Sequence, residues 1–137
     1  MSFGCPIERC QVGRFTCSRV RLELTVVTPT NETNQLFRFD TGADITMVSE
    51  DVATRLGLPP GGALIPISGS TATGVGRLVP VTLRFPPDMI SGLPRPAVAS
   101  TWAVIAGRTR LALVSFHEVD IWFYVGTDDA EMTFTNR

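Results

Sequence analysis

Asp40, Thr41 and Gly42 are the residues with the clearest chemical potential in this sequence. They follow the largely apolar stretch 36–39 and precede a second apolar stretch at 45–48. This pattern predicts a strand that holds one carboxylate in a fixed place, where it can serve as a general acid or base. Gly42 lets the chain turn sharply, and the Thr41 hydroxyl can bond neighbouring backbone or a matching turn. The same residue types also form ordinary turns between strands, so both interpretations stand at this point.

The stretch resembles the active-site segment of retropepsin-like aspartic proteases, in which a hydrophobic residue is followed by Asp, Thr or Ser, Gly and Ala. Phe39 and Ala43 complete that motif here, and Asp44 follows it. The resemblance implies that residues 40–42 are catalytic and that Ala43 and Asp44 contact the substrate. It also implies an all-β fold, a closed barrel of short strands with one or two short helices.

Aspartic proteolysis requires two carboxylates that share one proton, because like charges a few ångströms apart cannot both ionise. The ionised carboxylate draws a proton from a water molecule that attacks the peptide carbonyl, and the protonated carboxylate polarises that carbonyl. This chain has a single Asp-Thr-Gly motif, and its 137 residues are too few for a two-lobed enzyme. The resemblance therefore implies a homodimeric aspartic endopeptidase, with Asp40 of each subunit at the twofold axis, a peptide or protein substrate and no cofactor.

The segments around the motif read as the elements that would position it. Residues 20–26 alternate apolar with polar side chains, which is typical of a half-buried strand. A loop at 28–34 connects it to the strand that ends at Asp40, and this hairpin matches one wall of the family's site. Residues 50–56 are predicted to form a short helix, since a Ser precedes them and a Gly follows.

Residues 64–67 and 78–85 read as two apolar strands around the Gly-rich segment 68–76. An ordinary flexible hairpin fits these residues as well as a flap that closes over a substrate, and the position after Asp-Thr-Gly favours the flap. Gly74 and Gly76 are expected to supply its backbone freedom. The resemblance assigns substrate binding to Ser70, Thr71, Ala72, Thr73, Gly74, Val75 and Gly76.

The second half of the chain follows the family's order of elements. Strands are predicted at 101–105 and 111–114, and one or two helical turns within 115–121. Residues 123–125 and 131–134 read as a closing hairpin. The resemblance thus extends over most of the chain, although it is sharp only around Asp-Thr-Gly.

The family's second marker, two apolar residues followed by Gly and often Arg, has two candidates. Segment 104–108 contains Gly-Arg but lies early in the chain, whereas 113–116 lies at the expected place with Ser115 for Gly and Phe116 for Arg. We prefer 113–116, because strand order matters more than one residue type. In the family this Arg pairs with the Asp at the position of Asp44. Asp44 is therefore either exposed to solvent or paired with another residue, the candidates being Arg108, Arg110 and His117.

This departure from the family pattern leaves alternative functions open. The same fold is expected to serve as a catalytically weak or inactive dimerisation or peptide-binding module if the substitutions remove activity. A third possibility is an unrelated small β-barrel in which Asp-Thr-Gly is only a turn.

Composition indicates one globular domain, with 44% hydrophobic and 18% charged residues. Residues 1–14 show no clear periodicity and are predicted to be an N-terminal extension, with the protease domain at 15–137. All 12 basic residues are Arg, and their scatter along the sequence favours codon bias over anion recognition. A net charge of −1 without a basic cluster predicts no nucleic-acid partner, and no apolar run has the length of a membrane span.

Cysteine usage bears on the cellular compartment and on metal binding. Cys5, Cys10 and Cys17 form neither a disulfide framework nor a zinc-ligand pattern, and the chain has one His, at position 117. The first residues lack the pattern of a signal peptide. These features predict a cytoplasmic protein without a metal centre.

Overall fold

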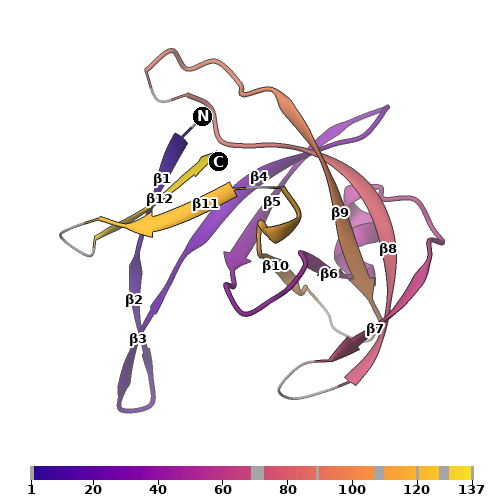
Figure 1. Cartoon of the computed structure of the whole chain (residues 1–137), viewed down its shortest axis with the longest axis horizontal. Helices are drawn as coiled ribbons and strands as arrows, with labels where there is room; N and C mark the ends of the chain where they lie inside the picture. The colour runs from indigo at the N-terminus through magenta and orange to yellow at the C-terminus, as the bar shows by residue number, and fades with distance from the viewer. Residues whose placement is uncertain are drawn as a thin grey trace.

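β-Strands dominate the structure, a computed structural model that describes residues 2–68, 73–88, 90–106, 110–119, 121–126 and 130–136 (Figure 1). The helical elements are α1 (Glu50–Leu56) and the short 3-10 helix η1 (His117–Val119). The strands are β1 (Ser2–Pro6), β2 (Glu8–Val12), β3 (Phe15–Arg19), β4 (Arg21–Val27), β5 (Glu32–Phe39), β6 (Met47–Ser49), β7 (Leu64–Ser68), β8 (Thr73–Arg84), β9 (Ala97–Ile105), β10 (Ala112–Val114), β11 (Ile121–Val125) and β12 (Glu131–Asn136). The expected β-rich class is confirmed.

A seven-stranded sheet forms the body, in the order β4-β5-β10-β6-β9-β8-β7. An additional antiparallel pairing of β4 with β8 closes this sheet on itself, which removes most of its free edges. Strand β10 lies between β5, to which it is parallel, and β6, to which it is antiparallel. The turn after β5 must therefore pass over the end of β10 before the chain enters β6.

The two ends of the chain lie together in a second sheet with the order β1-β12-β11. Strands β2 and β3 form a separate hairpin that continues directly into β4. This hairpin spans the predicted boundary between an extension at 1–14 and a domain at 15–137, a division that remains a prediction. Phe3 of β1 is 6% exposed, so part of the segment before residue 15 packs into the core.

An aromatic cluster joins the two sheets beneath the end of β5. Phe39 contacts the rings of Phe116, Phe123 and Phe134 at centroid distances of 5.8, 5.0 and 5.0 Å. Phe116 also contacts Phe85, at 5.7 Å. Buried aromatic pairs contribute packing beyond the area they remove from water, so this cluster makes a firm base for residue 40.

Helix α1 begins and ends where the sequence predicts. The Ser49 hydroxyl accepts a hydrogen bond from the Val52 N–H at 3.4 Å, and Gly57 closes the helix with φ of 75°. The start of β5 differs from the prediction. This strand begins at Glu32, inside the predicted loop 28–34. The polar residues at the start of β5 pair with β4 in an unbroken antiparallel register, and this pairing outweighs their local preference for turns. No helix in the described residues has the length and apolar character needed to cross a membrane.

Candidate active site

Asp40 lies directly after β5, where backbone hydrogen bonds fix the chain on both sides. Its N–H donates to the Val114 carbonyl at 3.0 Å, and the preceding Phe39 N–H donates to the Val20 carbonyl at 2.9 Å. The Asp40 carboxylate accepts a hydrogen bond from the Gly42 N–H at 2.9 Å. The Asp-Thr-Gly turn therefore orients its own carboxylate, which is half-buried at the surface.

The segment 113–116 lies beside this turn, as the order of predicted strands requires. Val114 pairs with Phe39 across the parallel β10–β5 ladder. The Ser115 N–H donates to the hydroxyl of Thr46 at 3.3 Å, which connects the end of β10 to the chain entering β6. Thr46 is fully buried and has no motif around it, so the sequence carried no signal of this role.

Ser115 and Phe116, which we expected at the positions of the family's Gly and Arg, make contacts of their own. The Ser115 hydroxyl donates to the Glu118 carboxylate at 2.9 Å. Phe116 is 1% exposed and has a left-handed φ of 63°, a conformation that a non-glycine side chain adopts only when its surroundings enforce it. An Arg at this position would need a partner in the apolar core, whereas Phe completes the aromatic cluster.

Asp44 is exposed and, within the described part of the chain, makes no hydrogen bond or ion pair. Of its predicted partners, Arg108 lies outside the described residues and Arg110 makes no described contact with it. The His117 imidazole lies instead 3.4 Å from the Thr41 carbonyl oxygen. Ala43, by contrast, is buried at the base of the turn.

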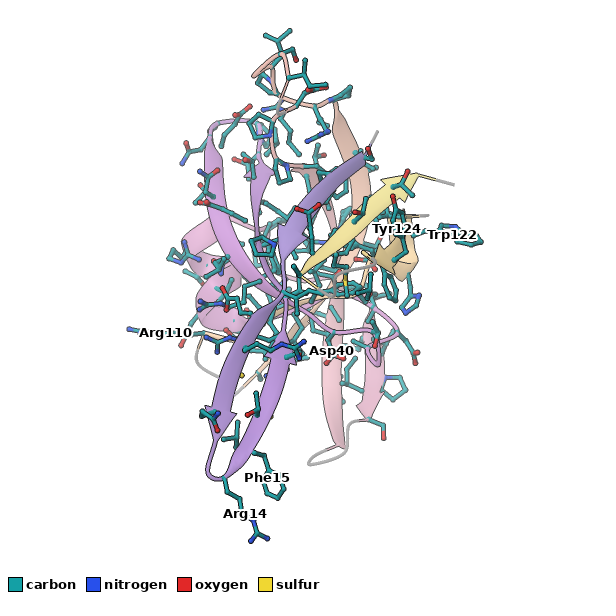
Figure 2. All side chains as sticks on the ribbon, turned by 90° about the vertical axis from the view of Figure 1, so that its left-hand side faces the viewer. Arg14, Phe15, Asp40, Arg110, Trp122 and Tyr124 are labelled. Carbon is teal, nitrogen blue, oxygen red and sulfur yellow. The ribbon has the colours of Figure 1, made fainter. Side chains whose placement is uncertain are left out.

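The predicted flap corresponds to the hairpin of β7 and β8, which pair from Leu64 opposite Arg77 to Ser68 opposite Thr73. Ser70, Thr71 and Ala72 lie outside the described residues. Strands β7 and β8 run toward the same end of the molecule as the β2–β3 hairpin, on the opposite side in Figure 1. Figure 2 shows Asp40 near the middle of the molecule and Arg14 and Phe15 at the tip of β2–β3.

The two glycines of the predicted flap have ordinary backbone conformations, and their freedom of movement remains a prediction. Neither Gly74 nor Gly76 has a φ in the left-handed region. A Cβ on Gly74 would meet no atom within 4 Å, whereas one on Gly76 would lie 3.0 Å from the Ile67 side chain and 3.4 Å from that of Ile105. Gly76 therefore serves close packing at the hairpin base.

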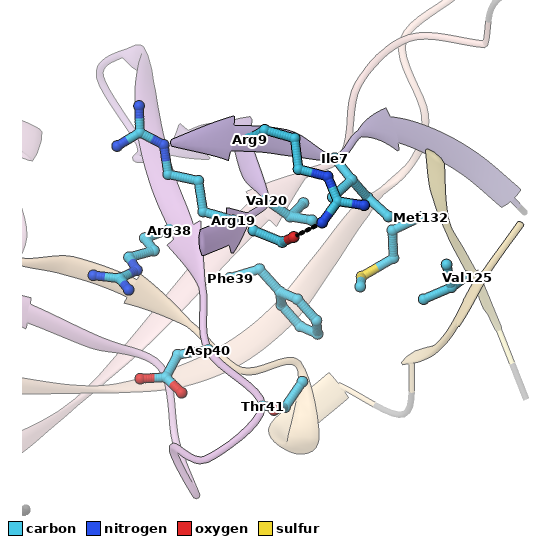
Figure 3. A pocket seen from close by; sticks show the side chains of 11 residues that line it. Ile7, Arg9, Arg19, Val20, Arg38, Phe39, Asp40, Thr41, Val125 and Met132 are labelled. Atoms are coloured by element: carbon cyan, nitrogen blue, oxygen red, sulfur yellow. Dashed lines mark hydrogen bonds between the residues drawn. The ribbon is translucent and has the colours of Figure 1, made fainter. Parts of the chain in front are cut away.

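A cleft of about 520 Å³ adjoins Asp40 (Figure 3). Three separate parts of the chain contribute to it, namely the β2–β3 hairpin, the end of β5 and the closing hairpin. Its lining residues are Ile7, Arg9, Ser18, Arg19, Val20, Arg38, Phe39, Asp40, Thr41, Val125 and Met132. Ile7 and Arg9 belong to the predicted extension and were not candidates in the sequence, because only the fold brings them near Asp40. No cluster of His, Cys, Asp or Glu among the described residues is placed to hold a metal ion.

Comparison with known proteins supports both the motif and the fold. Residues 24–85 match the family model described as aspartyl protease, a segment that contains Asp40 and the β7–β8 hairpin. No curated protein matches the chain. A crystal structure of a retropepsin-like aspartic protease from Rickettsia conorii has the same fold, with a TM-score of 0.59 over 99% of this chain and 92% of that chain. The two sequences are 15% identical, so this likeness describes the fold alone.

The closed sheet with Asp-Thr-Gly after β5 has the architecture of a retropepsin-like protein. Residues 24–85 thus match the aspartyl protease family model, and the chain has the fold of a retropepsin-like aspartic protease. The resemblance found in the sequence is thus confirmed, whereas the roles of the individual site residues remain predictions.

Proposed function

We propose that this protein is a homodimeric aspartic endopeptidase in which each subunit supplies Asp40. The observation that carries the proposal is the position of this carboxylate, held by the Gly42 N–H at the end of β5 and beside a cleft. The match of residues 24–85 to the aspartyl protease family model supports the same reaction class.

In the proposed reaction, the two Asp40 carboxylates share one proton across the twofold axis. The charged carboxylate removes a proton from a water molecule, which attacks the carbonyl carbon of the peptide bond. The protonated carboxylate donates a hydrogen bond to the carbonyl oxygen and stabilises the tetrahedral intermediate. The aromatic cluster below Phe39 keeps each carboxylate in place, so little reorganisation is needed during the reaction.

Two surfaces support the proposed dimer. Thr41 and Gly42 are exposed, so their turn is open to a matching turn of a second subunit. Strand β11 is an edge strand with four consecutive exposed apolar residues, and Trp122 and Tyr124 are 52% and 58% exposed (Figure 2). Long apolar edges are normally protected, and pairing with a second copy would protect this one. The free thiols of Cys5, Cys10 and Cys17 support a reducing, cytoplasmic setting for the dimer.

A non-catalytic peptide-binding module is the second candidate. The observation in its favour is that Phe116, which we expect at the position of the family's Arg, is buried in the core, while Asp44 is exposed and without a partner in the described chain. On this alternative the fold and the cleft persist while hydrolysis is lost.

The deciding experiment compares Asp40→Asn with Asp51→Asn, a control at an exposed carboxylate in the first turn of α1. Asn has nearly the shape of Asp but supplies neither the charge nor the shared proton. We expect peptide cleavage to vanish only in Asp40→Asn, with sedimentation showing a dimer that is retained or slightly tighter, because a like-charge pair is removed. Full activity in Asp40→Asn excludes Asp40 as the catalytic group, and an inactive wild-type dimer that binds peptides identifies the second candidate.

A further inference from the structure

The cleft beside Asp40 carries an excess of positive charge. Among the described residues that line it, Arg9, Arg19 and Arg38 supply three guanidinium groups, and Asp40 supplies the one carboxylate. These arginines are scattered in the sequence, and the codon-bias interpretation gave no reason to expect them in one place. The fold brings them together because β2, β3 and β5 meet at this cleft.

Arg19 is already neutralised by a neighbour. The Glu8 carboxylate accepts hydrogen bonds from the Arg19 guanidinium at 2.9 Å and from that of Arg21 at 3.0 and 3.2 Å. These bonds hold the pKa of Glu8 below its ordinary value, Arg21 being the largest cause and Arg19 the next. The single negative charge of Glu8 is thus shared by Arg19 and Arg21, and it does not neutralise the other arginines of the cleft.

Arg38 has no such partner. Its side chain is exposed, and within the described part of the chain it makes no hydrogen bond or ion pair. It lies directly opposite Arg21 in the β4–β5 ladder. Arg19 and Arg21 share the single Glu8 carboxylate, so one positive charge remains near Arg38 and favours an anion there.

The position of Arg38 places it next to the reacting groups. Arg38 lies in β5 and Asp40 directly follows this strand, two residues further on, and side chains at this spacing in extended chain point to the same face. Figure 3 shows both side chains on the same side of the ribbon, with Arg9 and the apolar side chains Ile7 and Met132 on the other. A peptide held over Asp40 therefore passes Arg38.

We propose that Arg38 is a specificity residue that binds a carboxylate side chain of the peptide substrate close to the bond that is cleaved. The proposal rests on the proposed function, since it names the substrate class of the same site. Arg presents two parallel N–H donors that match the two oxygens of a carboxylate, so Glu or Asp is favoured over Gln or Asn. Arg9, whose guanidinium donates to the neutral Ser18 hydroxyl, adds a second positive charge to the cleft.

The test uses pairs of fluorescein-labelled peptides that differ only by Glu or Gln at one position on either side of a central apolar pair. Cleavage is measured with the wild-type protein, and binding by fluorescence anisotropy in the Asp40→Asn background, where no peptide is consumed. Arg38→Gln is the test variant and Arg38→Lys the conservative one. Arg55→Gln, at an exposed site in the last turn of α1, is the control with the same change in net charge.

We expect the Glu peptide to bind about tenfold more tightly than its Gln partner at one or more positions. This preference disappears in Arg38→Gln, persists in part in Arg38→Lys and is unchanged in Arg55→Gln. Equal binding of every Glu and Gln pair overturns the proposal, as does a preference that survives Arg38→Gln. A clear Glu preference in binding without any cleavage refutes the protease reaction but leaves the carboxylate site in place.

Discussion

The Asp40 turn and the β7–β8 hairpin, which the sequence predicts to belong to one site, are held in different ways. The turn is fixed by backbone hydrogen bonds to Val114 and Val20 from the strand end and lies on a cluster of buried rings. Among the described residues, the hairpin is held by the β7–β8 pairing beyond the point where β8 leaves β9, at Gly76 opposite Ile105.

The hairpin is anchored at its base by Arg77. Its guanidinium binds the Glu50 carboxylate through two hydrogen bonds of 2.8 and 2.9 Å and the Pro59 and Gly61 carbonyls at 2.7 and 2.8 Å. The Arg77 side chain is only 14% exposed. This clamp connects the hairpin base to α1 and to the loop after it.

This difference suggests that the turn and the hairpin have different roles. A catalytic carboxylate works best when it needs no reorganisation, whereas a hairpin that covers a substrate must open and close. Changes below the turn should therefore affect stability and activity together, and changes in the outer hairpin should affect activity alone.

The largest effect is expected for Phe116→Ala. Removal of a buried ring from the cluster leaves a cavity and should lower the free energy of unfolding by about 3–5 kcal/mol. Cleavage should fall as well, because Phe39 loses part of its support. Phe15→Ala is the control, since Phe15 is 62% exposed on the β2–β3 hairpin. Thermal melting and cleavage rates of both variants provide the measurement. An unchanged melting temperature for Phe116→Ala would contradict the proposed role of the aromatic cluster as a support for Asp40.

A smaller effect is expected for Gly76→Val, and almost none on stability for Gly74→Val. The new side chain at Gly76 would crowd Ile67 and Ile105, which should cost about 1–3 kcal/mol, whereas Gly74 has open space. Both variants should reduce cleavage if the hairpin closes over the substrate, since Val restricts the backbone more than Gly. Melting curves and kcat/KM separate the two effects. Normal cleavage by a stable Gly74→Val protein would show that the outer hairpin is not a flap.

The smallest effect is expected for the ion pair between Arg77 and Glu50, whose contribution to stability depends on pH. The hydrogen bonds from Arg77 hold the pKa of Glu50 below its ordinary value of 4.5. Because the folded-state pKa is the lower one, the pair stabilises the protein above pH 4.5 and loses this contribution as pH falls through the folded-state value. Glu50 is partly exposed, so the gain is at most about 1 kcal/mol.

We therefore expect Glu50→Gln to melt slightly below the wild type near neutral pH and to match it at acidic pH. The double variant with Arg77→Gln removes the interaction itself and serves as the control, because the effect of Glu50→Gln should vanish in that background. A constant gap between wild type and Glu50→Gln at all pH values would exclude the ion pair as its cause.

Local patterns in the sequence were enough to predict much of the fold. The alternation at 20–26 corresponds to β4, with Leu22, Leu24 and Val26 buried. Ser49 and Gly57 set the ends of α1. These features follow from neighbouring residues, since side-chain period and capping are local properties.

The sequence by itself determined the strand into Asp-Thr-Gly, because the residues that form the turn also position its carboxylate through the Gly42 N–H. The tertiary structure alone decided what surrounds it. Thr46 bonds to Ser115, 69 residues away, and Phe116 accepts a left-handed backbone because the core encloses its ring. Arg38 shares a cleft with Ile7, Val125 and Met132, which lie far from it in the sequence. Contacts between residues far apart in the chain leave no local pattern, since each depends on how the whole sheet closes.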